Sequence, residues 1–229
     1  MAGAGSSGHA AMQPLFLRPG VYLATVRDDL VSLDLAAGEY ACLTAIGREV
    51  APPASDGRFE VTTADVADLL LEAGLAARRA SGEPRAGLPP PATVSCWRAE
   101  RALVTGADQR RFARAYMSAA PRFWRASFGA LVASAQRGRG RAQRDVVTPA
   151  SLRDAQVFDQ LAPFGPFAGE CLFRAFLLLA YLRRGGRDAT WVFGVRTYPF
   201  QAHCWLQVGD MVLNDAVERV CGYTPILAV

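Results

Sequence analysis

The chain contains the strand-like run Ala202-His203-Cys204-Trp205-Leu206-Gln207-Val208, which carries one of its two histidines. The other histidine, His9, lies in an N-terminal stretch of small residues. Upstream of the run, Cys171 is expected to begin an apolar helix, and downstream Asp215 closes a second apolar run. Cys, His and Asp in this order supply a thiol nucleophile, its base and the group that orients the base. We therefore predict a catalytic triad of Cys171, His203 and Asp215.

Cys171 is predicted to lie in the first turn of a helix that follows the turn-rich segment 163–169. Unpaired backbone N–H groups and the helix dipole at such a position stabilise a thiolate and lower the cysteine pKa. The same N–H groups can hold the oxyanion of a tetrahedral intermediate, and Gln160 or a backbone N–H near Gly169 are candidate second donors. A buried structural cysteine is the alternative interpretation, but the helix start after a glycine-containing turn favours a nucleophile.

A rival nucleophile, Cys204, stands next to His203 in the sequence. Neighbouring side chains on a strand point to opposite faces, so His203 and Trp205 share one face while Cys204 lies on the other. We therefore predict that Cys204 belongs to the core. The other cysteines lack a nearby partner and are expected to be structural: Cys42, Cys96 and Cys221.

Asp215 can orient His203 only if both side chains lie on the same face of the sheet. A two-residue turn after Val208 would place Asp215 on the wrong face, whereas a three-residue loop over residues 209–211 would bring it to the His203 face. We therefore predict the three-residue loop or a bulge, with Asn214 as the alternative orienting residue. Taken alone, Asp215 could equally be a turn residue at a strand end.

The composition is that of an ordinary well-cored protein. Hydrophobic residues make up 51% of the 229 residues and charged residues 20%, which fits one or two domains. No run of about 18 apolar residues exists, so no membrane span is expected, and the N-terminus does not resemble a secretory signal. The five cysteines form no C-x-x-C pair, which argues against a disulfide framework and a zinc knuckle. We expect reduced thiols, a cytoplasmic location, no metal and no cofactor. The sequence contains no phosphate-binding G-x-x-x-x-G-K-[ST] loop from which a nucleotide dependence could be judged.

The net charge of +4 comes from arginine, part of it clustered within residues 137–144. Such a patch could bind nucleic acid. However, no aromatic residues for base stacking are interleaved, and Gly138 and Gly140 interrupt any helix there. We interpret the cluster as a solvated loop and expect no nucleic-acid partner.

The composition changes sharply at residues 80–95, where four prolines and two glycines stand among few large apolar side chains. This composition is typical of a linker. The change divides the chain into a front module at residues 14–80, a linker at 81–95 and a back module at 96–229.

The front module is predicted to combine a small sheet with two helices. Apolar and alternating patterns indicate strands at residues 21–26, 30–35 and 40–43. A short helix at 44–50 and a second helix, capped by Thr63 and stopped by Gly74, follow them. A sheet with a helix-turn-helix predicts a winged-helix-like domain.

The back module begins with helices and ends with strands. Helices are expected at residues 109–116, 123–135 and 148–158, and from Cys171 to Arg184. Strands are expected at residues 189–195, 202–208 and 212–215. Helices followed by an antiparallel sheet define an α+β fold.

Ordered blocks in the back module resemble a known family. The blocks are Cys171-Leu172-x-Arg174-Ala175, Leu182-Arg183-Arg184-Gly185-Gly186, Val192-Phe193-Gly194-Val195, Pro199-Phe200-x-Ala202-His203-Cys204-Trp205 and Val212-Leu213-Asn214-Asp215. From Gly169 to about Gly222 the chain resembles the leader peptidase of lasso-peptide biosynthesis, the B protein. The resemblance implies a transglutaminase-like or papain-like cysteine-protease fold. The family usually has alanine at the position of Cys204, which supports Cys171 as the nucleophile.

The resemblance also implies a role for the front module. Fused B proteins carry a winged-helix recognition domain that binds the leader as an added strand on a sheet edge, beside a helix. Carried onto this chain, the groove lies between the third strand and the helix at 63–74. The leader-binding candidates are Tyr40, Ala41, Cys42, Leu43, Val66, Leu69 and Leu70.

The implied function is a cysteine endopeptidase that removes the leader from a ribosomally made lasso precursor. An ATP-dependent cyclase that resembles asparagine synthetase then closes the ring, so the precursor and this cyclase are the expected partners. One alternative is an acyltransferase on the same fold, in which an amine resolves the thioester. The other is a non-catalytic protein that binds peptide or DNA through its winged helix; the intact Cys, His and Asp set argues against it.

Overall fold

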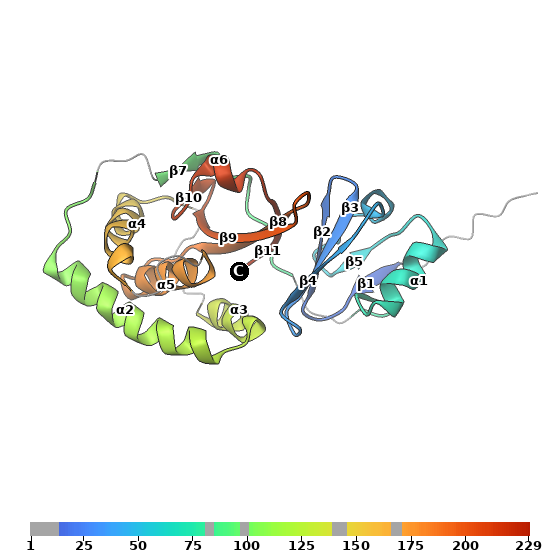
Figure 1. Ribbon diagram of the computed structural model, residues 1–229, viewed down its shortest axis with the longest axis horizontal. Helices are drawn as coiled ribbons and strands as arrows, with labels where there is room; N and C mark the ends of the chain where they lie inside the picture. The colour runs from blue at the N-terminus through green and yellow to red at the C-terminus, as the bar shows by residue number, and fades with distance from the viewer. Residues whose placement is uncertain (1–13, 81–84, 97–100, 139–145, 166–170) are drawn as a thin grey trace, which may run out of the picture.

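The structure is a computed structural model that describes residues 14–80, 85–96, 101–138, 146–165 and 171–229. It has two lobes that lie side by side (Figure 1), one built from the front module and one from the back module. His9 lies outside the described residues.

The front lobe contains two small antiparallel sheets and one α-helix. One sheet has the order β2-β3-β4, from β2 (Val21–Val26), β3 (Asp29–Asp34) and β4 (Glu39–Leu43). The other has the order β5-β1-β6, from β5 (Arg58–Phe59), β1 (Leu15–Leu17) and β6 (Ala76–Ala77). The helix is α1 (Ala64–Glu72), and the Thr63 side chain accepts a hydrogen bond from the Val66 N–H at 3.4 Å as its N-cap.

The predicted helix at residues 44–50 is wrong. In its place the structure has one turn of 3-10 helix, η1 (Gly47–Glu49). The backbone at Gly47 lies so close to β3 that an added Cβ would come within 2.5 Å of the Asp29 carbonyl oxygen, and Val50 is already extended and bridged to Val61. The described front lobe therefore contains no helix-turn-helix, and the winged-helix likeness is not confirmed.

Strand β3, the central strand of the sheet β2-β3-β4, is buried on both faces. Leu23 and Leu30 belong to the core of the front lobe, whereas Val31 and Leu33, both 0% exposed, belong to a cluster that continues into the back lobe. Adjacent residues of a strand point to opposite faces, so β3 contributes to two cores at once. The two lobes are therefore joined by an apolar contact.

The described part of the predicted linker is docked on both lobes. Arg85 donates hydrogen bonds to the carbonyls of Val21 and Arg18, at 2.5 and 3.1 Å. Further along, the Pro90 carbonyl accepts a hydrogen bond from the Gln207 side chain at 2.7 Å. The segment then forms β7 (Val94–Ser95), which pairs in parallel with β10 (Met211–Val212). These residues are therefore part of the fold rather than a free tether.

The helical side of the back lobe differs from the prediction at one boundary. The elements are α2 (Gly106–Arg125), α3 (Phe128–Arg137), α4 (Pro149–Leu161), η3 (Ala162–Phe164) and α5 (Cys171–Arg184). The helices expected at 109–116 and 123–135 are instead a long α2 that continues through Pro121, followed by α3. A capping box at Thr105 starts α2 early. On either side of Pro121, Tyr116 and Phe123 both pack on Phe173 of α5, with ring centroids 5.9 and 5.0 Å apart.

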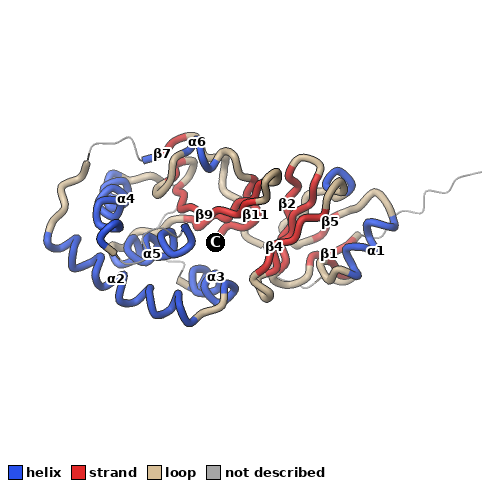
Figure 2. Tube along the Cα trace, in the orientation of Figure 1, coloured by secondary structure: helices blue, strands red, loops and turns tan. Residues whose placement is uncertain are grey.

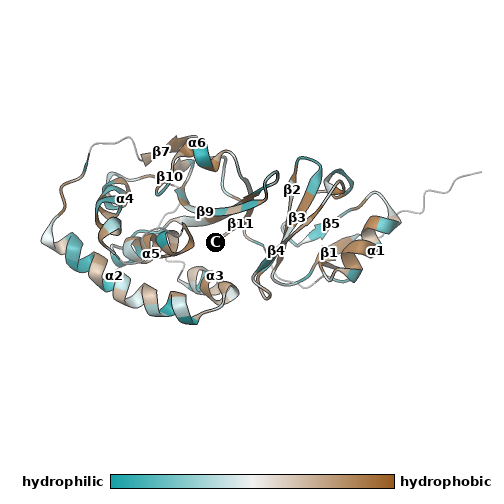
Figure 3. Ribbon diagram, in the orientation of Figure 1, coloured by the Kyte–Doolittle hydropathy of each residue, from teal (hydrophilic) through white to brown (hydrophobic). Residues whose placement is uncertain are grey.

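Helix α2 buries one side only. In Figure 3 it carries hydrophilic and hydrophobic residues in alternation, as expected of a helix with one solvent-facing side. By contrast, most of α5 is buried.

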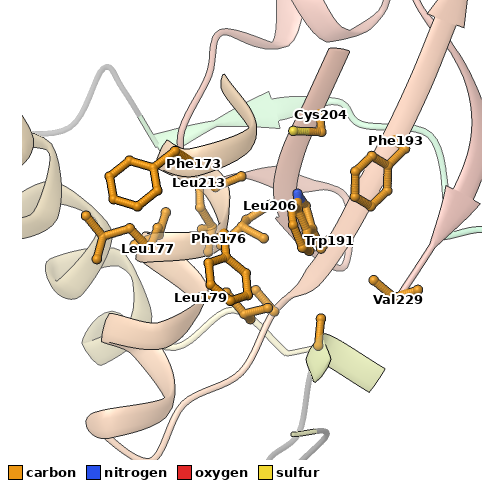
Figure 4. Packing of buried hydrophobic residues seen from close by; sticks show 14 of the residues in the cluster. Phe173, Phe176, Leu177, Leu179, Trp191, Phe193, Cys204, Leu206, Leu213 and Val229 are labelled. Atoms are coloured by element: carbon orange, nitrogen blue, oxygen red, sulfur yellow. The ribbon is translucent and has the colours of Figure 1, made fainter. Parts of the chain in front are cut away.

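The sheet of the back lobe has the order β11-β8-β9-β10-β7. Its central strands are β8 (Thr190–Arg196) and β9 (Gln201–Val208), and β11 (Thr224–Ala228) forms one edge. Helix α5 packs on this sheet through an aromatic core. Figure 4 shows Phe176 of α5 beside Trp191 and Leu206, with Phe193 beyond Trp191 and Phe173 on the opposite side of the cluster. The short helix α6 (Val217–Val220) follows β10.

The two lobes meet along their sheets. Figure 2 shows the strands of both lobes in the centre of the molecule, with β11 next to β2. No helix in the described part of the chain is long and apolar enough to cross a membrane.

Candidate active site

Cys171 is the first residue of α5, as predicted, and its side chain is partly exposed. A pocket of about 320 Å³ opens beside it. The pocket is lined by Gly38, Tyr40, Phe128, Cys171, Leu172, Phe193, Ala202, His203 and Cys204. A larger cleft of about 460 Å³, between β2, the linker and β11, has no cysteine or histidine in its lining. The smaller pocket is therefore the candidate active site.

His203 and Asp215 form a close pair. His203 Nε2 donates to Asp215 Oδ2 at 2.5 Å, and the two side chains are only 11% and 12% exposed. The Ala216 N–H donates to the other carboxylate oxygen at 2.8 Å, and Arg219 Nε lies 3.8 Å from it. Burial opposes ionisation of Asp215, but the hydrogen bonds from His203 and Ala216 outweigh it and lower the pKa of Asp215.

Cys171 and His203 are coupled to each other. Hydrogen bonds from Cys204 and then from His203 lower the pKa of the Cys171 thiol to about 4, against the effect of burial. Burial lowers the pKa of His203, but hydrogen bonds to Asp215 and Cys171 raise it to about 9. Between these two values the site holds a thiolate beside an imidazolium, which is the reactive state of a cysteine nucleophile. The two largest causes of the low Cys171 pKa are thus side-chain hydrogen bonds from Cys204 and His203, neighbouring residues of β9.

The early end of the pairing between β9 and β10 explains how the backbone N–H of Cys204 can reach the Cys171 thiolate. The backbone of Cys204 also lowers the Cys171 pKa through a hydrogen bond. Strand β10 ends at Val212. The last contacts between β9 and the chain after β10 are made at Leu206, whose N–H donates a hydrogen bond to the Asn214 side-chain oxygen at 2.7 Å. Beyond this point the edge of β9 is not covered by β10, so the Cys204 N–H can face the thiolate.

Of the two predicted routes from β9 to Asp215, a three-residue loop or a bulge, the three-residue loop is wrong. Met211 pairs with Val208, so the turn has two residues, Gly209 and Asp210. Asp215 nevertheless reaches His203, because regular pairing stops after Val212 and the chain bends over residues 213–215. Asn214, the alternative orienting residue, uses its side-chain oxygen for β9 instead.

Cys204 lies in the core, as predicted, with 2% of its surface exposed. Burial and the neighbouring Cys171 raise its pKa well above the usual range, which leaves it protonated. The sequence did not indicate the contact between the two thiols. Of the cysteines expected to be structural, Cys96 is buried, but Cys42 and Cys221 are exposed.

The structure does not assign either predicted oxyanion donor to the site. Gln160 directs its amide to the carbonyls of Ala102 and Gln156, at 2.9 and 3.3 Å, so its N–H groups are already in use. Gly169 lies outside the described residues.

The seven predicted leader-binding residues do not form one groove. Figure 1 shows β4 on the side of the front lobe that faces the back lobe, and α1 on the opposite side. Val66 and Leu70 of α1 are 6% and 0% exposed and belong to the front core, so they are not available to a peptide, whereas Leu69 is 40% exposed. On β4, Ala41 and Cys42 are exposed and Leu43 is partly buried.

Tyr40 differs from the rest of its strand. It lines the pocket beside Cys171, and burial together with the nearby Cys204 and Cys171 raises the pKa of its hydroxyl. Nothing in the local sequence marks this residue as part of the active site, because its position depends on how the lobes pack.

A protein-family model matches the part of the chain that contains Cys171, His203 and Asp215. Residues 116–228 match the family model described as the transglutaminase-like superfamily. The back lobe therefore carries a transglutaminase-like domain.

Within the described residues, no group of three or more His, Cys, Asp or Glu side chains is arranged to hold a metal ion.

A named relative matches a shorter stretch of the chain. Over 50 residues the chain is 44% identical to the microcin J25-processing protein McjB of Escherichia coli. The match covers 22% of this chain and 24% of that protein, so it spans about a quarter of the relative. No solved structure matches the chain significantly.

Proposed function

We propose that the chain is a cysteine peptidase that removes the leader from a ribosomally made lasso-peptide precursor. The observation that carries the proposal is the pocket that joins Cys171 to the hydrogen-bonded pair of His203 and Asp215. The transglutaminase-like match and the likeness to a microcin-processing protein support the same chemistry and substrate class.

The ionised pair suggests the order of steps. The Cys171 thiolate attacks the carbonyl at the leader–core junction, and a carbon–sulfur bond forms as the carbonyl becomes an oxyanion. The His203 imidazolium gives its proton to the departing amine, so the peptide bond breaks and a thioester remains. Neutral His203 then takes a proton from water, which attacks the thioester and releases the leader. Asp215 holds the imidazole in place throughout.

The front lobe supplies the surface proposed for the leader. Strand β4 pairs with β3 alone among the described strands, so its outer edge offers backbone groups to a peptide added as a further strand. The exposed residues Ala41 and Cys42 lie on this strand. The released core would have a free amino terminus, which an ATP-dependent lasso cyclase would use. We place the reaction in the cytoplasm, where the Cys171 thiol stays reduced.

Mass spectrometry of a leader-bearing precursor tests the proposal. The wild-type protein should make a single cut at the leader–core junction, and Cys171→Ala should make none. The matched control is Cys204→Ala, which removes the neighbouring buried thiol and should still cut. Cutting by Cys171→Ala that equals the wild type would contradict the assignment.

Acyl transfer is the second candidate, and the transglutaminase-like family match is the observation that favours it. In that reaction an amine, rather than water, attacks the thioester. The mass of the released acyl product distinguishes the two reactions, because hydrolysis adds the elements of water and aminolysis adds the amine.

A further inference from the structure

The pocket beside Cys171 has walls from both lobes. The back lobe contributes Phe128 of α3 and Phe193 of β8, whose rings lie 5.3 Å apart. The front lobe contributes Gly38 and Tyr40, from the hairpin that joins β3 to β4. The front lobe therefore shapes the site at which chemistry is proposed.

Packing contacts within the front lobe and with the back lobe hold the front wall in place. Tyr40 pairs across the sheet with Leu33, which is 0% exposed and part of the core shared by the lobes. Its ring packs against Phe200 of the back lobe at 6.1 Å between centroids. Gly38 has φ +73°, and a Cβ added there would lie 3.6 Å from the Phe128 Cβ. The wall is thus fixed by packing rather than by a mobile loop.

The chemistry of the lining is mainly apolar. Phenylalanine, leucine and alanine side chains face the space next to Cys171, and the volume of about 320 Å³ is at the lower end of ligand pockets. Burial and the nearby thiols keep the Tyr40 hydroxyl protonated, so it adds no charge. Such a space suits an uncharged side chain rather than an acidic or basic one.

We propose that Gly38 and Tyr40 form the specificity-determining wall of a substrate pocket, and that this pocket takes an apolar side chain next to the attacked carbonyl. The inference rests on the proposed role of Cys171. The front lobe then has a second task besides leader binding, because it selects the residue at the cut. Separation of the lobes would remove the pocket even with the triad intact.

Alkylation of Cys171 tests the pocket without any peptide cleavage. The full-length protein is treated with iodoacetamide or with N-benzyliodoacetamide, and mass spectrometry measures the rate at each cysteine. The thiolate displaces iodide in both reactions, so the reagents differ only in the apolar group. Cys221 is exposed and outside the pocket, and it therefore gives the intrinsic ratio of the two rates in the same molecule.

We expect the benzyl reagent to be favoured at Cys171 over Cys221 by about tenfold, the effect of a well-fitted apolar group. Tyr40→Trp fills the pocket and should abolish this preference, while Tyr40→Phe should retain it. Tyr198→Trp makes the same change at a tyrosine that is 69% exposed and outside the lining, so it should behave as wild type. Tyr40→Ala, which removes the wall, should also lose the preference if Tyr40→Trp does not fold.

An equal ratio at Cys171 and Cys221 in the wild type, or a preference that survives both Tyr40→Trp and Tyr40→Ala, would overturn the proposal. The peptidase assignment fails separately. A wild-type protein that shows the benzyl preference but cuts no precursor would support the pocket and contradict the peptidase. A wild-type protein that cuts the precursor but shows no benzyl preference would support the peptidase and contradict the pocket.

Discussion

Replacement of Asp215 by asparagine tests the electrostatics of the site most directly. Asparagine keeps the size of the side chain and an oxygen for the Ala216 N–H, which lies 2.8 Å from Asp215 Oδ1. It removes the negatively charged carboxylate oxygen that accepts the 2.5 Å hydrogen bond from His203. The change therefore isolates the charge from the packing.

The structure sets the size of the expected effect. The pKa of His203 rises from 6.5 to about 9, and at about 1.36 kcal/mol per pKa unit this is roughly 3 kcal/mol in favour of the imidazolium. Burial opposes the rise, Asp215 is the largest favourable cause and Cys171 is the next. If Asp215 supplies at least half of the net effect, roughly 1.5 kcal/mol, Asp215→Asn lowers the pKa of His203 by at least about one unit.

The direction of the expected pH shift follows from the role of the proton on His203. The imidazolium is present below the pKa of His203 and is lost as the pH rises through it, so the alkaline limb of kcat/KM in the wild type is expected near pH 9. The acid limb is expected near pH 4, where Cys171 becomes protonated. In Asp215→Asn the alkaline limb should move to lower pH by at least about one unit, and kcat/KM should fall by about 10²- to 10⁴-fold.

The assay is the pH dependence of kcat/KM for precursor cleavage, with the pH dependence of Cys171 alkylation measured in parallel. Arg219→Ala is the matched control, because its guanidinium lies 3.8 Å from Asp215 but is 66% exposed. It should shift the alkaline limb only slightly. An alkaline limb that stays in place in Asp215→Asn would refute the idea that this carboxylate stabilises the imidazolium.

Two further predictions concern a neighbouring thiol and a buried ion cluster. Cys204→Ala removes the largest cause that lowers the Cys171 pKa, so the acid limb of Cys171 alkylation should move to higher pH while cutting continues; an unmoved limb would show that the contact has no electrostatic effect. Asp154 is 1% exposed and pairs with Arg111 and Arg187, so Asp154→Ala removes a carboxylate shared by two cations, of which only Arg111 keeps a second acidic partner among the described residues, Asp108 at 3.5 Å. It should reduce the free energy of unfolding by about 3–5 kcal/mol. Urea unfolding measures this change, and a loss below about 1 kcal/mol would show that solvent compensates the arginines.

The local elements of the active site could be predicted well from the sequence. A cysteine after a turn-rich segment marks the start of α5, and the spacing of His203 and Cys204 on a strand shows which thiol is core. These features depend on neighbours within a few residues, and helix caps and strand alternation act over that range. The family-like blocks lie in the same region, and the transglutaminase-like match includes it.

Predictions were less successful where a feature depends on a distant segment. The route of Asp215 to His203 was predicted through a loop of the wrong length, because the early end of β10 and the hydrogen bond from the Leu206 N–H to Asn214 cannot be derived from local pattern. The predicted helix at 44–50 failed for a similar reason, since Gly47 packs against the backbone of β3.

The sequence alone therefore determined the identity and order of the three proposed catalytic residues, the helix that presents the thiol and the strand that presents the imidazole. Tertiary structure decided which groups surround them. It brought the Cys204 thiol and backbone to Cys171, turned Asp215 onto His203 and placed Tyr40 of the front lobe in the pocket. The physical reason is range: local propensities set secondary structure, but a pocket between lobes exists only after the apolar faces of both have been buried together.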